Sequence, residues 1–279
     1  MKHIVCYSGG VSSSLVGAMV VKKFGKENTI WLNHEVKAEP EDVARYEQEF
    51  AKAHGMEITY ANGDTTKYPN LTPYDVIKKE KAFAVRHGAG ESVLCTHRLK
   101  TDPFNKWLEE NYENGDVIYY GFDKGETARI QRRSTILASQ GYKSDYPLAL
   151  WENPLDRTYL EEIGVAPPMQ YKVFKHANCR GCIKGGIQHW LCVYVHDRET
   201  FDEFAELEEE IGHSILRKGY LNEMRGYFEK IRKSGVEITE HKQAQTFWAE
   251  VRRKLKGQKT LTDFFEGARM ATKPCECLI

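Results

Sequence analysis

The stretch Tyr7–Leu15, YSGGVSSSL, constrains the fold more than any other part of the sequence. It follows a short apolar run, His3–Tyr7, that is typical of a buried strand, and apolar residues at helical spacing then continue until Gly25. We therefore predict a strand, a glycine loop and a helix. Adjacent glycines let backbone N–H groups approach a ligand, and a helix N-terminus offers unpaired donors at the positive end of its dipole. The loop suits a phosphate, because an ordinary strand-to-helix turn needs one capping serine rather than several.

The composition narrows the class of protein. A chain of 279 residues can form one large α/β domain, or one domain with a helical appendage. Lys plus Arg and Asp plus Glu each number 40, so the net charge favours neither a nucleic-acid nor a membrane partner. No apolar stretch reaches the length of a membrane span, and the start MKHIVCYSGG lacks the features of a signal peptide. We expect a cytoplasmic protein, in which the 7 cysteines favour metal or thiol chemistry over disulfides.

Apolar strands alternate with amphipathic helices over most of the chain. The strand candidates are TIWLNHE (29–35), MEITYA (56–61) and DVIYYGF (116–122), and the helix candidates are 40–55, 74–88 and 103–111. This alternation predicts a parallel sheet covered on both faces, which binds ligands at the carboxyl ends of its strands. From Glu199 to Gly257 the pattern becomes polar and helical, with apolar stripes that we interpret as helix-packing faces. We therefore predict a nucleotide-binding domain over 1–198 and a helical C-terminal region over 199–279.

Six segments in this order resemble a known family: SGGVSSS, NHEVKAEPEDVARYEQEF, CTHRLKTDPFNKWL, YYGFDKGETARI, YPLALW and CRGCIKGG. The chain resembles the PP-loop (N-type) ATP pyrophosphatases and, among them, the phosphoadenosine phosphosulfate (PAPS) reductase-like family. The resemblance covers roughly the first two thirds of the chain. It implies a doubly wound, mostly parallel sheet of the adenine nucleotide alpha-hydrolase type. In ATP-using members an acceptor attacks the α-phosphate, an adenylated intermediate forms and pyrophosphate leaves, assisted by Mg²⁺.

The resemblance also assigns residues to the nucleotide site. They are Ser8, Gly9, Gly10, Val11, Ser12, Ser13 and Ser14 in the phosphate loop, with Asn33, His34, Glu35, Lys100, Gly121, Lys124 and Glu126 around the nucleotide. Ser8, Ser12 and Ser13 are the catalytic candidates of the loop. Ser12 stands where the family usually has an Asp, which removes a carboxylate that could help to hold Mg²⁺. His34 could instead be a capped loop residue, and Lys100 could contact phosphate or merely cover a helix end.

A second group of candidates consists of cysteines. Cys179 and Cys182 have the Cys-x-x-Cys spacing that lets two thiolates bind one metal or cluster, and the resemblance adds Cys95. The fourth ligand is Cys192 or is absent, which would leave one metal position open. We favour a [4Fe-4S] cluster, with zinc as the competing metal and a redox pair as the alternative without metal. Cys6, in the first strand, is expected to be a small buried hydrophobe.

The C-terminal tail raises two further hypotheses. Glu276 and Cys277 resemble the end of PAPS reductases, where a cysteine attacks the sulfonucleotide, although such matches arise easily in tails. Gln258–Phe265 has the spacing of peptides that dock onto the PCNA type of sliding DNA clamp, a short turn with apolar anchors. The simpler interpretation is a last amphipathic turn that packs on the body.

Together these patterns predict an ATP-binding PP-loop enzyme that adenylates a substrate for sulfur transfer or a related modification, with a cysteine-bound iron–sulfur cluster. The acceptor could be tRNA, DNA or a small molecule, and a homodimer is compatible with the resemblance. One alternative is a PAPS or adenosine phosphosulfate reductase that uses Cys277 as nucleophile. Another is a non-catalytic nucleotide-binding accessory protein of a DNA-associated system, which Ser12 and the clamp-like Gln258–Phe265 segment favour.

Overall fold

The computed structural model describes residues 1–34, 36, 40–61, 71–87 and 90–256. These residues form two compact units. The first unit holds the described residues of Met1–Asn70 and Arg98–Met169, and the second holds those of Leu71–His97 and Gln170–Cys277. Residues 170–198 therefore group with the C-terminal helices. Within the described ranges, no helix is both long and apolar enough to cross a bilayer.

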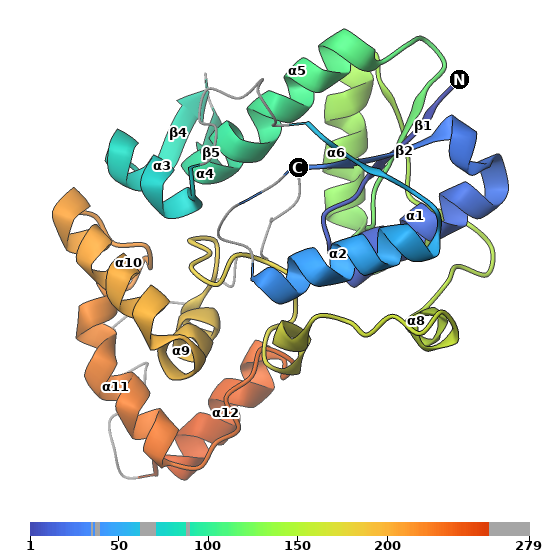
Figure 1. Cartoon of the computed structure of the whole chain (residues 1–279). Coiled ribbons are helices and arrows are strands. Elements are labelled where there is room, and N and C mark those ends of the chain that lie inside the picture. Colours follow the sequence, from blue (N-terminus) through green and yellow to red (C-terminus); the bar gives the residue numbers. More distant parts are fainter. Residues whose placement is uncertain (35, 37–39, 62–70, 88–89, 257–279) are drawn as a thin grey trace. The chain divides into compact units, whose positions relative to one another are not determined.

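The first unit is an α/β fold built on a five-stranded parallel sheet (Figure 1). Its strands are β1 (His3–Cys6), β2 (Thr29–Asn33), β3 (Ile58–Tyr60), β6 (Val117–Tyr119) and β7 (Lys143–Asp145), in the order β3-β2-β1-β6-β7. The chain thus leaves β1 toward β2 on one side and later returns to β6 on the other. The carboxyl ends of β1 and β6 form the topological switch point, where open parallel sheets bind ligands.

Helices cover both faces of this sheet. They are α1 (Val11–Phe24), α2 (Glu41–Ala53), α5 (Asp102–Asn111), α6 (Thr127–Ser139), the short α7 (Pro147–Leu150) and α8 (Thr158–Glu162), with a 3₁₀ turn at Lys26–Asn28. On one face Cys6 and Ile118 join a buried cluster with Phe104 of α5 and Leu137 of α6. On the other face Trp31 meets α1 and α2. Both faces are apolar because successive strand residues point to opposite sides.

The second unit is mainly helical. It contains α3 (Pro73–Glu80), the hairpin β4 (Ala84–His87) and β5 (Gly90–Val93), α4 (Leu94–Thr96), a 3₁₀ turn at Met169–Lys172, α9 (Ile187–His196), α10 (Arg198–Ile211), α11 (Leu221–Lys233) and α12 (Ala244–Lys254). The apolar stripes of α10, α11 and α12 pack into one buried core around α9, which confirms their interpretation as helix-packing faces. A π-helical turn, His97–Thr101, leads into α5.

The helix expected over residues 74–88 is only half right. A capping box between Thr72 and Asp75 starts α3, but Lys81 adopts a left-handed conformation with φ 50° and ends it. Ala84–His87 then pairs with Gly90–Val93 as an antiparallel hairpin. Phe83 and Val85, two positions apart, therefore belong to the start of this hairpin rather than to a helix.

Candidate functional site

The phosphate-loop candidate lies between β1 and α1, at the switch point of the sheet. Gly9 has φ 68°, and a Cβ there would collide with the carboxylate of Glu47. Gly10 is the N-cap of α1, but no side chain caps the helix and its first turn holds no acidic residue. The first turn of the 14-residue helix α1 thus carries no acidic side chain of its own, and the carboxylate of Glu47 lies beside Gly9 at this edge.

The serine hydroxyls divide into two roles. Ser13 Oγ accepts from Ser8 N at 3.2 Å and donates to the Gly10 carbonyl at 2.8 Å, and Ser14 Oγ donates to the same carbonyl at 3.1 Å. These two hydroxyls shape the loop from within. Ser12, by contrast, is exposed in the first turn of α1. Ser12 is thus the serine of this turn that faces solvent, at the position where the resemblance expects an Asp.

Gly121, at the end of β6, closes the loop from the other side of the switch point. A Cβ at Gly121 would lie 2.8 Å from Ser13 N and 2.9 Å from the Ser12 carbonyl carbon. These are backbone atoms, so a larger residue would displace the start of α1. The structure thus brings Gly121 and the first turn of α1 together, two segments more than a hundred positions apart in the sequence.

Next to the loop, a buried carboxylate of α2, that of Glu47, is hydrogen-bonded to Asn33 at the end of β2. Glu47 of α2 is 5 % exposed, and its Oε1 accepts from Asn33 Nδ2 at 2.9 Å. Tyr7 O–H donates to the Glu47 carbonyl at 3.0 Å, so loop, strand and helix are joined through one residue. Glu47 was not among the sequence candidates, although its carboxylate lies on the same helix face as the apolar Val43 and Phe50, which is a signal for a buried functional group.

His34 is the most unusual side chain in this region. It is 1 % exposed, and neither ring nitrogen has a hydrogen-bond partner among the residues that the structure describes. Burial, followed by the charge of Lys100, lowers the pKa of His34 to about 3, so the ring is neutral. Phe104 packs edge-on against the ring at 5.9 Å. Lys100 is thus close enough for its charge to act on the His34 ring.

The loop from Gly121 to Glu126 is held by its own side chains. Asp123 Oδ1 accepts from Gly125 N at 2.7 Å, and Glu126 Oε2 accepts from Asp123 N at 3.1 Å. The other oxygen of Glu126 pairs with Arg129, whose guanidinium lies over the Phe122 ring. The side chains of Asp123 and Glu126 thus stabilise the loop through hydrogen bonds within it, while the side chain of Lys124 is exposed.

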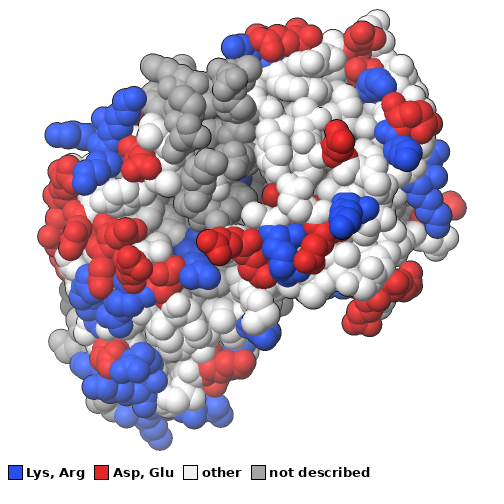
Figure 2. Space-filling model, viewed as in Figure 1, with Lys and Arg blue, Asp and Glu red and all other residues white. Residues whose placement is uncertain are grey.

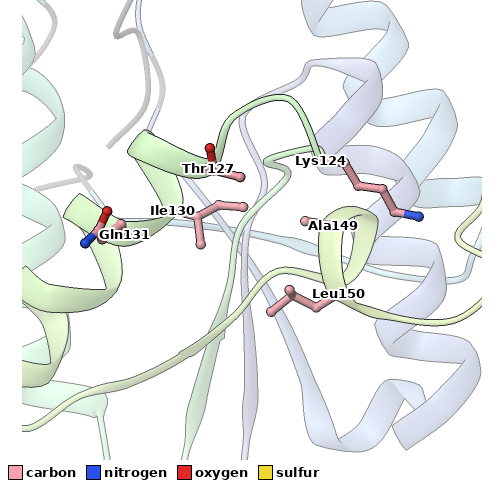
Figure 3. Close-up of a pocket in the computed structure, with 6 residues that line it drawn as sticks. All are labelled: Lys124, Thr127, Ile130, Gln131, Ala149 and Leu150. Atoms are coloured by element: carbon pink, nitrogen blue, oxygen red, sulfur yellow. The ribbon is translucent and has the colours of Figure 1, made fainter.

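A hollow of about 470 Å³ adjoins this loop (Figure 3). Its walls come from the loop after β6, from α6 and from α7, and its lining residues are Lys124, Thr127, Ile130, Gln131, Ala149 and Leu150. Figure 3 shows Ile130 and Ala149 facing each other across it. Leu150 is 64 % exposed, which is high for a leucine. Apart from Lys124, no residue of the hollow was a sequence candidate, because its members form no recognisable motif.

The cysteines lie in the second unit, apart from Cys6. Cys179 and Cys182 are half-buried in the loop before α9, and Cys95 is half-buried in α4 against the helical core. Cys192 is fully buried in that core, and burial, with the charge of Glu240, raises the pKa of its thiol. Within the described residues, no three His, Cys, Asp or Glu side chains converge as metal ligands.

One contact relates Cys95 to the other two cysteines. A Cβ at Gly181 would collide with the ring of Phe204, and Tyr74 of α3 packs edge-on against the same ring at 5.6 Å. Helix α3 in turn contacts α4, which carries Cys95. The cysteine loop and α3 therefore pack against the same residue of α10, and α3 is the neighbour of the segment that carries Cys95.

Several sequence candidates lie outside the described residues. They are Glu35, Cys277 and the clamp-like segment Gln258–Phe265. Cys6, 2 % exposed within the sheet, is a buried hydrophobe as expected, and burial raises its pKa to about 12.

On the face shown in Figure 2, the charges of the described surface do not favour binding of a polyanion. Figure 2 shows Lys and Arg interspersed with Asp and Glu over that face. The class defined by the fold is an α/β protein with a five-stranded parallel sheet and a ligand-sized hollow beside its switch point. No protein-family model, curated protein or solved structure matches this chain.

Proposed function

We propose that the chain is an ATP-binding PP-loop enzyme, related to PAPS reductases, that adenylates an acceptor with release of pyrophosphate. The observation that carries the proposal is the loop at the switch point. No side chain caps the start of α1, and Gly9 has a left-handed backbone conformation. Gly121 lies so close to the backbone of Ser12 and Ser13 that a Cβ there would collide with it. Such a site presents backbone N–H groups and a positive dipole end to an anion, which suits phosphate.

In the proposed reaction an oxygen of the acceptor attacks the α-phosphorus of ATP. The bond between that phosphorus and the bridging oxygen breaks, and pyrophosphate carries the electron pair away. Backbone N–H groups at the start of α1 stabilise the charge that develops on pyrophosphate, and the exposed Ser12 hydroxyl adds a donor. Mg²⁺, held mainly by the phosphates since Ser12 replaces the usual Asp, would neutralise part of this charge. His34 and Asn33 belong to the nucleotide side of the site.

The test of the loop is ATP affinity, measured by calorimetry in the presence of Mg²⁺. Gly121→Ala should weaken binding at least about tenfold, because its Cβ displaces the N–H groups at the start of α1. The matched control is Gly226→Ala, on α11, where a Cβ meets nothing within 4 Å. Unchanged affinity in a folded Gly121→Ala protein would remove the loop from the nucleotide site.

We place the acceptor in the hollow beside the loop. The segment that touches α1 at Gly121 lines the hollow at Lys124, so an acceptor there would lie next to the phosphates. Ala149→Trp should fill the hollow and lower acceptor-dependent pyrophosphate release at least about tenfold, with ATP affinity unchanged. Equal loss of ATP affinity would place the nucleotide itself in the hollow.

Cys95, Cys179 and Cys182 are the proposed ligands of an iron–sulfur cluster. Cys179 and Cys182 share one loop, and Cys95 lies in the same unit, packed against the helical core to which Phe204 belongs. We leave Cys192 out of this set because a thiolate would be strongly disfavoured in the helical core. A cluster with three protein ligands would supply an open iron for sulfur transfer.

A further inference from the structure

A buried histidine and a half-buried glutamate contact the backbone of the Cys-x-x-Cys turn and of the chain before it. His189 of α9 is 7 % exposed; its Nδ1 lies 2.6 Å from Glu240 Oε1, and its Nε2 lies 2.8 Å from the carbonyl oxygen of Arg180. Arg180 is one of the two residues between Cys179 and Cys182. The histidine therefore joins the loop after α11 to the centre of the cysteine turn.

Both partners of His189 are acceptors, which fixes the chemistry of the contact. A backbone carbonyl cannot donate, and an ionised carboxylate can only accept. The two ring nitrogens face a carboxylate oxygen and a carbonyl oxygen, so the ring bridges Glu240 and the cysteine turn. Burial alone would raise the pKa of Glu240, but the hydrogen bond and charge of His189 outweigh it and leave the pKa below its usual value. Charge-assisted bonds of this kind are the strong ones.

Glu240 also holds the start of the same loop. Its second oxygen accepts from Lys175 N at 2.9 Å, and its own N–H donates to the Val173 carbonyl at 2.8 Å. The carboxylate thus joins two points of one loop, directly at Lys175 and through His189 at Arg180. This arrangement fixes the backbone on both sides of Cys179.

The two residues between the cysteines carry further anchors. The guanidinium of Arg180 pairs with Asp197, the N-cap of α10, at 3.0 Å, and Gly181 packs against Phe204. Gly185 N donates to the Cys182 carbonyl at 2.8 Å. The turn is therefore positioned through its backbone and through the side chain of Arg180.

We infer that His189 and Glu240 are positioning residues that hold the Cys179–Cys182 turn in the geometry from which both thiolates bind one metal. The inference rests on the proposed metal site, and it assigns a role to two side chains that no motif singles out. Hydrogen-bonded outer groups of this kind typically change metal affinity 10- to 100-fold when they are removed.

The experiment compares Glu240→Gln, His189→Gln and their double variant with the wild-type chain. Hydrogen exchange of the metal-free, reduced chain reports the geometry of the turn. The amides of residues 179–186 should exchange at least about tenfold faster in both single variants, and the double variant should exchange no faster than either. The control is His196→Gln, on the same helix, whose ring contacts the carbonyl of Ile238.

Cobalt(II) titration, followed by the thiolate-to-metal absorption bands, reports binding. The dissociation constant should rise about tenfold or more in both single variants and remain unchanged in His196→Gln. Unchanged exchange in the turn, or faster exchange spread evenly over α9–α11, would overturn the inference. If His189→Gln does not fold, the exchange rates and cobalt affinity of Glu240→Gln alone test the inference, because this variant keeps the size of the side chain and an acceptor oxygen. A wild-type chain that binds neither cobalt nor iron would instead refute the metal site. The exchange rates of residues 179–186 would still test whether His189 and Glu240 hold the turn.

Discussion

At the scale of single residues, His34 is the side chain whose environment is hardest to explain without a ligand. Burying two ring nitrogens without partners destabilises the folded state, since each buried polar atom without a partner costs on the order of 1 to 3 kcal/mol. Asn33 next to it is fully used, as its amide donates to Glu47 and its oxygen accepts from His34 N at 2.6 Å. The unmet hydrogen-bonding capacity is therefore confined to the imidazole, at the carboxyl end of β2.

A pH series of chemical unfolding tests this environment. His34 has a depressed pKa of about 3 when folded, against 6.5 when unfolded, so its contribution to stability is present above pH 6.5 and is lost as the pH falls toward 3. The loss should amount to roughly 5 kcal/mol. His34→Leu should remove this part of the pH dependence and raise stability at pH 7. A variant that keeps the wild-type acid profile would show that the imidazole is hydrated.

At the scale of elements, the sequence predicted the parts of the chain whose periodicity is undisturbed. The strands around Ile4, Trp31 and Ile118 and the helices that follow the first two are where they were expected, because burial on two faces leaves clear apolar runs. Residues 74–88 could not be predicted correctly, since a left-handed Lys81 is invisible to a pattern of apolar residues. The Glu47 carboxylate and the hollow depend on contacts distant in sequence, which no motif encodes.

The loop between α10 and α11 depends on one buried carboxylate. Glu208 is fully buried and accepts from Ile215 N and Leu221 N, each at 2.5 Å. It therefore ties down the loop and caps the start of α11 from a neighbouring helix. Burial raises the pKa of Glu208 to about 7 in spite of these hydrogen bonds.

This raised pKa predicts a second pH dependence, opposite in sign to that of His34. Below pH 4.5 the carboxyl is protonated in both states, and as the pH rises to about 7 the folded state loses roughly 3 kcal/mol relative to the unfolded state. Glu208→Gln should flatten stability between pH 4.5 and 7, whereas Glu206→Gln, exposed on the same helix, should not. A Glu208→Gln profile parallel to the wild type would contradict the assignment.

At the scale of the whole molecule, the two proposed chemistries belong to different units. The phosphate loop, His34 and Gly121 lie in the first unit, and Cys95, Cys179 and Cys182 lie in the second. The resemblance links these segments through their order in the chain, and neither unit alone contains all of them. The nucleotide site and the metal site can therefore be tested independently.

Metal analysis of the anaerobically purified chain tests the second chemistry. We expect about four irons per chain with matching sulfide and a brown colour. Cys182→Ala should lose both, because one missing thiolate leaves two protein ligands. Cys192→Ala and Cys6→Ala should retain the iron, since both residues are buried in apolar surroundings. Zinc in place of iron would support the same cysteine ligands but a different metal. Full iron content in Cys182→Ala would exclude Cys182 from the ligands.

The start of α1, where Gly10 is the N-cap and the first turn holds no acidic residue, has a consequence for the degradation of the protein in a cell. A helix that lacks both a capping side chain and a first-turn carboxylate forgoes stability that an anion can restore. If nucleotide supplies that anion, the empty chain opens more often at its central strand, and proteases act on the open form. The half-life of the protein would then follow the nucleotide supply, so that starvation would lower its abundance without any change in its synthesis.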